Sequence, residues 1–343
     1  MRSRPSGTAD AYRRFAELEA HGNSPTYEAL SNGVAADPEL LELLDLLPPG
    51  KRQPNLLLAA VRHLGGPTAS YREFRAWVLA HWERVRAVML ARLTQTNESA
   101  RCAVLLPLLA ALPQPLALIE VGASAGLCLY PDRYRYAYDG AEAFGHPDSP
   151  ITLPCRTSGP VPPPCPLPTV TWRAGIDLNP LSASDPEDVR WLESLVWPEQ
   201  RERLTRLRGA LSVARGEPAL LLRGDLNATV RRLVAQAPAG ATPVVFHSAV
   251  LAYLPGAARQ EFVRTVRELP CHWISNEAPG VLPGLKERLP VPVPAGRGVF
   301  LLALDGRPVA FTSPHGQRLD WFAREPGPGS TAAPGPSHPM PVT

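Results

Sequence analysis

The sequence predicts an α/β protein whose doubly wound sheet ends in an antiparallel hairpin and follows an all-helical segment. Three observations predict this fold. No strand pattern precedes Leu116, buried strand patterns alternate with helical patterns after it, and two strand patterns joined by Asp305-Gly306 close the sheet. In such a sheet, ligands bind at the carboxyl ends of the parallel strands. The residues that end each predicted strand are therefore the first candidates for a site.

We expect residues 1–110 to form the helical segment. Asp37-Pro38 marks a helix start, and the apolar residues between 71 and 93 keep the helical spacing of a face packed on a core. A cluster of hydrogen-bonding side chains at residues 94–98 then interrupts the apolar pattern. Two interpretations stay open: Thr96 or Asn97 caps the next helix, or the cluster faces a site formed at the first strand.

The first predicted strand ends in Glu120 and a turn of small residues, Gly122-Ala123-Ser124-Ala125-Gly126. Glycine allows positive φ angles and close approach of a ligand, and a helix after the turn would add unpaired N–H groups and the positive end of its dipole. Two chemistries can use this turn. It can hold a nucleotide-like cofactor, or it can present a nucleophilic serine, because it also reads G-x-S-x-G.

Each of the next four predicted strands ends in a side chain that can bind or react. These residues are Asp177, Asp225, His247 and Glu277. Together with Glu120 they place polar groups at one edge of the expected sheet.

Two segments are expected to lie outside the regular structure. Six prolines between residues 150 and 168 predict an inserted loop near residues 140–169, without a central strand. Residues 325–343 are rich in Pro, Gly, Ser and Ala and are expected to form a disordered tail. The sheet-containing domain is expected to span residues 111–324.

Composition gives no signal for several classes of partner, although it does not exclude a nucleic-acid substrate. A net charge of +3 gives no strong electrostatic signal for nucleic acid or a membrane surface. The five cysteines show no zinc-ligand spacing, so no metal site is expected and the thiols are expected to be reduced. The N-terminus lacks an apolar signal region, and prolines interrupt the longest apolar run, so a cytoplasmic protein is expected. The oligomeric state has no signal in the sequence.

The strand ends resemble those of class I S-adenosylmethionine-dependent methyltransferases. In that family the first strand ends in an acid and a G-x-G-x-G loop, the second in an acid that binds the ribose hydroxyls, and the third in an acid near the adenine. The resemblance implies S-adenosylmethionine as the cofactor, held by Glu120, Gly122, Ala123, Ser124, Gly126, Asp177, Leu178, Asp225 and Leu226. Ser124 replaces the middle glycine of the family. Asp139 competes with Asp177 for the ribose, because it lies at the shorter spacing of the dinucleotide fingerprint; the order of the elements favours Asp177.

The same resemblance implies transfer of a methyl group to an acceptor that the sequence does not identify. Transfer needs an in-line nucleophile near the methyl group and sometimes a base. His247 is the candidate base, because it ends the fourth predicted strand. Glu277 and Tyr253 are further catalytic candidates, and the acceptor pocket is assigned to Asn97, Glu98, Arg101 and Asn276. Each of these residues also has an alternative as a helix cap or a structural hydrogen-bonding partner.

Two other functions remain open. A serine hydrolase would use Ser124 with Asp177 or Asp225 and a histidine such as His247 or His315, but only helices precede the turn and no HGGG-like segment appears. A non-catalytic protein would bind a nucleotide or a partner protein.

A second, more specific resemblance is carried by six motifs, which are similar to those of an uncharacterised bacterial family, domain of unknown function 2332. They are TQTNE, EVGASAGL, GIDLNP, LVWP, VVFHSAVLAYLP and SNEAPGV. This resemblance runs from about residue 10 to residue 322, and it implies domain boundaries but no established activity.

Overall fold

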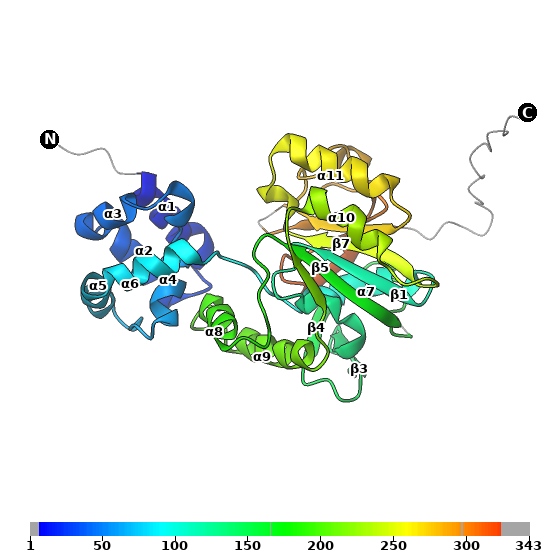
Figure 1. The fold of residues 1–343 in the computed structure, drawn as a ribbon, viewed down its shortest axis with the longest axis horizontal. Coiled ribbons are helices and arrows are strands. Elements are labelled where there is room, and N and C mark those ends of the chain that lie inside the picture. Colours follow the sequence, from blue (N-terminus) through cyan, green and yellow to red (C-terminus); the bar gives the residue numbers. More distant parts are fainter. Residues whose placement is uncertain (1–6, 165, 296–297, 324–343) are drawn as a thin grey trace, which may run out of the picture.

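A computed structural model describes residues 7–164, 166–295 and 298–323 of the chain. A group of N-terminal helices, blue in Figure 1, lies beside a mixed β-sheet that carries its own flanking helices. The expected tail, residues 325–343, lies outside the described residues.

Every regular element described before Leu116 is a helix, as the sequence predicts. The helix at Asp37-Pro38 begins where expected, because Asp37 Oδ1 accepts hydrogen bonds from the N–H groups of Glu39 and Leu40. The helical pattern of residues 71–93 forms two helices, which are separated at His81. The helices are α1 Gly7–Phe15, α2 Pro25–Ala35, α3 Pro38–Asp45, α4 Pro54–His63, α5 Tyr71–Ala80, α6 Trp82–Ala91 and α7 Arg101–Ala111.

Among the described residues the sheet has eleven strands, in the order β3-β2-β4-β11-β10-β9-β8-β7-β1-β5-β6. The five strands β6, β5, β1, β7 and β8 run parallel, and β9 runs antiparallel to β8. The strands are β1 Leu116–Val121, β2 Arg135–Tyr138, β3 Phe144–Gly145, β4 Thr152–Ser158, β5 Val170–Asp177, β6 Leu220–Arg223, β7 Thr242–Ser248, β8 His272–Glu277, β9 Phe300–Leu304, β10 Arg307–Thr312 and β11 Arg318–Trp321.

The hairpin of β9 and β10 forms at the expected turn. Asp305 and Gly306 have φ angles of 50° and 74°, and two consecutive positive φ values are the signature of a two-residue type I′ turn. The hairpin strands follow β8 in chain order across the sheet.

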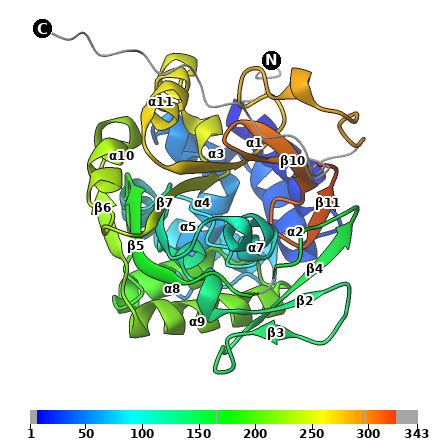
Figure 2. The same cartoon turned by 90° about the vertical axis from the view of Figure 1, so that its right-hand side faces the viewer.

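Helices cover both faces of the parallel strands (Figure 2). Side chains of α7, α8 (Pro186–Leu195) and α9 (Arg201–Gly216) form one apolar core, and those of α10 (Leu226–Ala235) and α11 (Gly256–Glu268) form a second. Alternate residues of β1 enter the two cores: Leu116 and Leu118 the first, Ile119 and Val121 the second. We call the two sides of the sheet the α7 face and the α11 face.

Two sequence predictions are wrong. Residues 152–158 form the interior strand β4 between β2 and β11, although a loop was expected there. Only one proline, Pro154, lies inside this strand, and buried and exposed residues alternate along most of it. The second correction concerns the glycine turn, which leads into a three-residue 3-10 segment, Leu127–Leu129, and not into an α-helix. In the part of the chain that the structure describes, no helix is long and apolar enough to cross a membrane.

Candidate functional site

The glycine turn after β1 is held entirely by hydrogen bonds within the protein. Gly122, Ser124 and Gly126 have positive φ angles of 72°, 49° and 68°. The N–H groups of Gly122 and Ala123 donate to Ile176 O, Gly126 N–H donates to Ala123 O, and the two remaining N–H groups donate to side chains. The turn therefore offers no unpaired N–H group, and no α-helix N-terminus follows it, so the expected anion cradle is absent here.

One of those side chains is Asn97, from the polar cluster at residues 94–98. Its amide nitrogen donates to Ser124 Oγ at 2.8 Å, and its Oδ1 accepts from Ala125 N–H at 3.0 Å. Ala100, the residue before α7, makes no side-chain capping bond. Of the two interpretations of this cluster, the geometry matches the one in which it faces the turn.

The second side chain on the turn is Asp177, at the end of β5. Its Oδ2 accepts from Ser124 N–H at 2.8 Å, and its Oδ1 accepts from Asn179 N–H at 2.7 Å. A β-carbon on the neighbouring Gly175 would lie 2.5 Å from the Ala123 side chain, so the glycine lets β5 and the turn approach closely. Leu178 follows with 69% of its surface exposed.

Glu120 is the buried acid behind this turn. Only 8% of its surface is exposed, and its Oε2 has no hydrogen-bonding partner among the described residues. Burial, together with the adjacent Cys128 thiol, raises the pKa of Glu120 well above its usual value. An unpartnered buried carboxyl oxygen is a costly feature, which a ligand that donates a hydrogen bond would relieve.

The alternation of side chains decides which strand-end residues meet. On β1, Glu120 is two residues after Leu118 and therefore points to the same side, the α7 face. On β5, Asp177 follows Ile176, which points to the α11 face, so Asp177 also points to the α7 face. By the same reasoning Ser248 and Asn276 lie on the α7 face, where Asn276 Nδ2 donates to Ser248 Oγ. Asn276 Oδ1 also accepts from Thr312, which leaves its amide fixed in the core.

His247 and Glu277 lie on the α11 face. Trp273 Nε1 donates to His247 Nε2 at 3.0 Å, so the histidine proton is on Nδ1, which is 2.7 Å from Glu277 Oε1. His247 is fully buried. The expected role of His247 as a base finds no support, because both ring nitrogens are engaged and the ring faces away from Glu120.

Glu277 also serves a structural role. Its Oε1 accepts from the N–H groups of Val250 and Leu251, which follow Ala249 with its positive φ of 60°. Burial opposes the charged form of Glu277, but these bonds and the one from His247 outweigh it and hold the pKa of this carboxyl below its usual value. The pair therefore fixes the loop after β7.

Three other expected site residues lie elsewhere or have structural partners. Tyr253 is 87% exposed and points away from the core. Asp225 Oδ1 caps α10 by accepting from the N–H groups of Asn227 and Ala228, and Leu226 is buried in the apolar core of that helix.

Asp139 is not brought near Asp177. It follows β2, which runs opposite to β1, so it lies at the other edge of the sheet, where its carboxylate binds the N–H and hydroxyl groups of Thr157.

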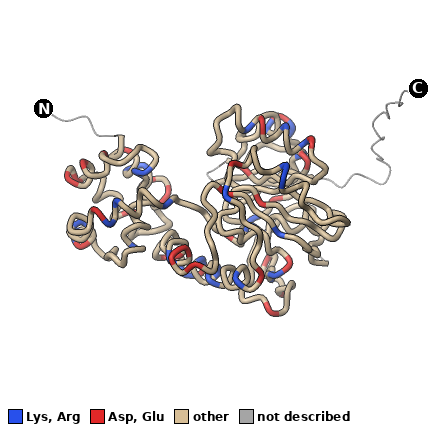
Figure 3. Tube along the Cα trace, viewed as in Figure 1, with Lys and Arg blue, Asp and Glu red and all other residues tan. Residues whose placement is uncertain are grey.

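A charged cluster on the α7 face includes residues that belong to no recognisable sequence motif. Glu98 Oε2 lies 3.1 Å from Arg203 Nε, and Glu98 Oε1 lies 3.5 Å from Arg206 Nε. Arg101 donates to the carbonyls of Ser248 and Pro314, the latter next to His315. Acidic and basic residues alternate irregularly along the chain (Figure 3). The arginines therefore come together around Glu98 through folding, and not through a run of basic residues in the sequence.

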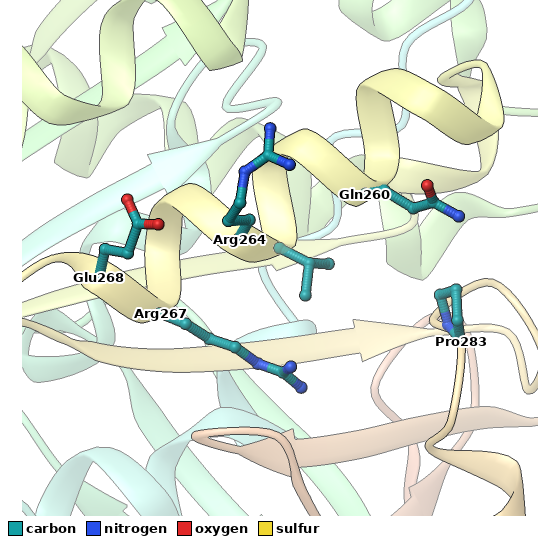
Figure 4. Close-up of a pocket in the computed structure, with 6 residues that line it drawn as sticks. Gln260, Arg264, Arg267, Glu268 and Pro283 are labelled. Atoms are coloured by element: carbon teal, nitrogen blue, oxygen red, sulfur yellow. The ribbon is translucent and has the colours of Figure 1, made fainter.

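Two hollows in the surface are lined by residues that the sequence did not predict for the site, apart from the glycine turn, which borders one of them. One of about 280 Å³ is lined by Ala125, Tyr130, the loop 180–184, Ala214 of α9 and residues at the start of β6. Another of about 410 Å³ lies along α11 between Gln260 and Glu268, with Pro283 opposite (Figure 4). The first adjoins the glycine turn, and the second is lined by none of the strand ends.

Residues 9–321 match the family described as "Uncharacterized protein conserved in bacteria (DUF2332)", and the chain belongs to that family. Comparison with curated proteins gives no match.

Proposed function

We propose that this member of the DUF2332 family binds S-adenosylmethionine at the glycine turn and transfers its methyl group to an acceptor. The observation that carries the proposal is Glu120, a buried carboxyl with an unpartnered Oε2 behind the turn. S-adenosylmethionine carries an ammonium group on its methionine part, and an ammonium can donate to such an oxygen.

The hydrogen bonds of the turn favour this cofactor over a dinucleotide. A pyrophosphate binds where glycine-turn and helix N–H groups are free. Here the five N–H groups of residues 122–126 all have protein acceptors. A nucleoside cofactor without phosphate does not need those donors.

Asp177 and Leu178 fit the two other parts of the cofactor. Asp177 Oδ1 accepts from Asn179 N–H and, at 3.4 Å, from Gln95 Nε2. Oδ2 accepts only from Ser124 N–H among the described residues, and its second acceptor position could take a ribose hydroxyl. The exposed Leu178 side chain provides an apolar surface for a base ring beside the ribose site. The strand order β6-β5-β1-β7-β8 supports the proposal, because the acids of the resemblance follow adjacent parallel strands.

In this proposal the cofactor supplies the methyl group, and the residues of the chain bind and orient. Glu120 and Asp177 hold the two polar ends of the cofactor, and Asn97 keeps the turn between them in place. The hydrolase alternative gains no support, since Ser124 Oγ accepts from Asn97 and has no histidine partner among the described residues.

Isothermal titration with S-adenosylhomocysteine tests the proposal. We expect binding to the wild type and a loss of affinity of about tenfold or more in Leu178→Asp, an exposed position where substitution leaves the core intact. Asp139→Ala is the matched control, because that acid lies at the opposite edge of the sheet. Absence of binding to the wild type, or equal affinity in both variants, would overturn the proposal.

A further inference from the structure

Three arginines converge on the α7 face around one carboxylate. Arg203 and Arg206, one turn apart on α9, both approach Glu98, and Arg101 begins α7 nearby. Arg101 is 7% exposed and Glu98 is 2% exposed. We call Arg101, Arg203 and Arg206 the arginine cluster.

The cluster carries more positive than negative charge. Glu98 is the carboxylate that lies between the guanidinium groups, one against three, and burial raises the pKa of Glu120, the other acid that interacts with Arg101. His315, which lies among them, adds no charge at neutral pH, because burial and the nearby Arg203 lower its pKa to about 4. Buried charges are normally paired, since an unpaired one loses its hydration without compensation. The imbalance therefore leaves room for an additional anion.

The guanidinium groups are also only partly used. Arg101 is oriented by two hydrogen bonds: its Nε donates to the Pro314 carbonyl oxygen, and its Nη1 donates to that of Ser248. No described residue accepts a hydrogen bond from the terminal nitrogens of Arg206. The Nδ1 atom of His315 is likewise buried without a partner. Donors held in place but unsatisfied are what a carboxylate or phosphate group requires.

A neighbouring arginine shows that burial and unused hydrogen-bond donors are not common to all arginines of α9. Arg208 is on the same helix, but its side chain is 61% exposed and it forms two hydrogen bonds with Glu193. The side chain of Arg206 is only 14% exposed.

We infer that the arginine cluster binds the oxyanion group, a carboxylate or a phosphate, of a small molecule. Its position suits the acceptor of the proposed reaction: Glu98 follows Asn97, which binds the glycine turn, and Arg101 binds the carbonyl at the end of β7 beside β1. That role as acceptor site rests on the proposed function, whereas anion binding itself does not.

Thermal unfolding of the full chain tests the inference, with sodium phosphate and sodium succinate compared separately against sodium chloride at equal ionic strength. We expect one or both oxyanions to raise the unfolding temperature progressively with concentration. Arg206→Gln should abolish the shift, and Arg208→Gln should retain it. The two salts distinguish a phosphate site from a carboxylate site.

Equal effects of chloride and both oxyanions on the wild type would overturn the inference, and so would an undiminished shift in Arg206→Gln. If Arg206→Gln unfolds, Arg206→Lys takes its place and should weaken the shift, because phosphate also stabilises folded proteins by exclusion from their surface and a wild-type shift alone is not specific. Titration with S-adenosylhomocysteine is read separately. If the oxyanions stabilise the protein but S-adenosylhomocysteine does not bind, the anion site is supported and the proposed function is contradicted.

Discussion

Glu120 on β1 and His247 on β7 end adjacent parallel strands, but their side chains leave opposite faces of the sheet. Glu120 lies on the α7 face with Asp177, and His247 lies on the α11 face between Glu277 and Trp273. The parallel register pairs Val121, not Glu120, with His247. Because neighbouring residues on a strand point to opposite faces, this shift of one residue places Glu120 in the candidate site and His247 in a buried structural network.

This arrangement predicts that His247→Leu destabilises the protein without changing the site. The substitution leaves the buried Glu277 carboxylate without its side-chain donor, and we expect the free energy of unfolding to fall by about 3 kcal/mol. Urea unfolding measures the loss, with His272→Leu at the partly exposed start of β8 as the control. Affinity for S-adenosylhomocysteine below the unfolding transition should stay within about twofold. Lost affinity with unchanged stability would contradict this role.

Gly122→Ala should be more destabilising than a positive φ angle alone explains. Gly122 and Gly240 have φ angles of 72° and 83°. A β-carbon on Gly122 would lie 2.2 Å from Val250 Cγ2, whereas nothing lies within 4 Å of one on Gly240. We expect Gly240→Ala to cost about 1–2 kcal/mol, and Gly122→Ala to cost a further 1–3 kcal/mol or so for the steric clash.

Urea unfolding of both variants and of Gly122→Ala/Val250→Ala measures the difference. The double substitution removes the clashing methyl groups and should regain part of the stability. Equal losses at the two glycines would show that the turn and the loop after β7 do not constrain each other.

Cofactor binding should release protons through Glu120. Burial raises the pKa of this carboxyl in the free protein, and an ammonium group placed beside it would favour the ionised form. Affinity for S-adenosylhomocysteine should therefore increase as pH rises toward the raised pKa. Calorimetry in buffers of different ionisation enthalpy measures the protons released. Glu120→Gln should bind without this release, and an unchanged release in that variant would assign it to another group.

His315 should make the protein sensitive to acid. Burial and Arg203 lower its pKa to about 4 from 6.5, so below pH 6.5 the unfolded chain takes up the proton first. The free energy of unfolding should then fall with pH, and His315 should account for about 2 kcal/mol of the loss between pH 7 and pH 5. Urea unfolding in phosphate-free buffer at both pH values measures this loss.

The matched variant is His315→Gln, which cannot titrate. It should lose less stability than the wild type over the same pH interval. An equal loss in the two proteins would mean that other groups carry the acid sensitivity.

Local signals explain what the sequence predicted of the fold. The buried strand ending at Asp177, the cap at Asp37 and the turn at Asp305-Gly306 each depend on residues close together in the chain. β4 could not be found this way, because its pairing with β11 is a long-range contact and Pro154 argues against a strand.

Some residues of the candidate site could likewise be predicted from local motifs, and others could not. Glu120, Asp177 and Asn97 were selected from local motifs, and the structure brings them to one turn. Side-chain alternation along β7, which is readable in PVVFHS, would have separated His247 from them. Arg203 carried no signal, and His315 was a candidate only for the hydrolase alternative, because α9 and the last loop meet only through the fold.

The pairing of β4 with β11 also affects the order in which the protein can be completed during synthesis. Ser158 and Asp320, which are 162 residues apart, are joined by a hydrogen bond of 2.6 Å. β2, β3 and β4 meet the rest of the sheet only through β11 in the described strand order. A ribosome makes these three strands long before their partner, so their exposed edge must wait for the last described strand to emerge.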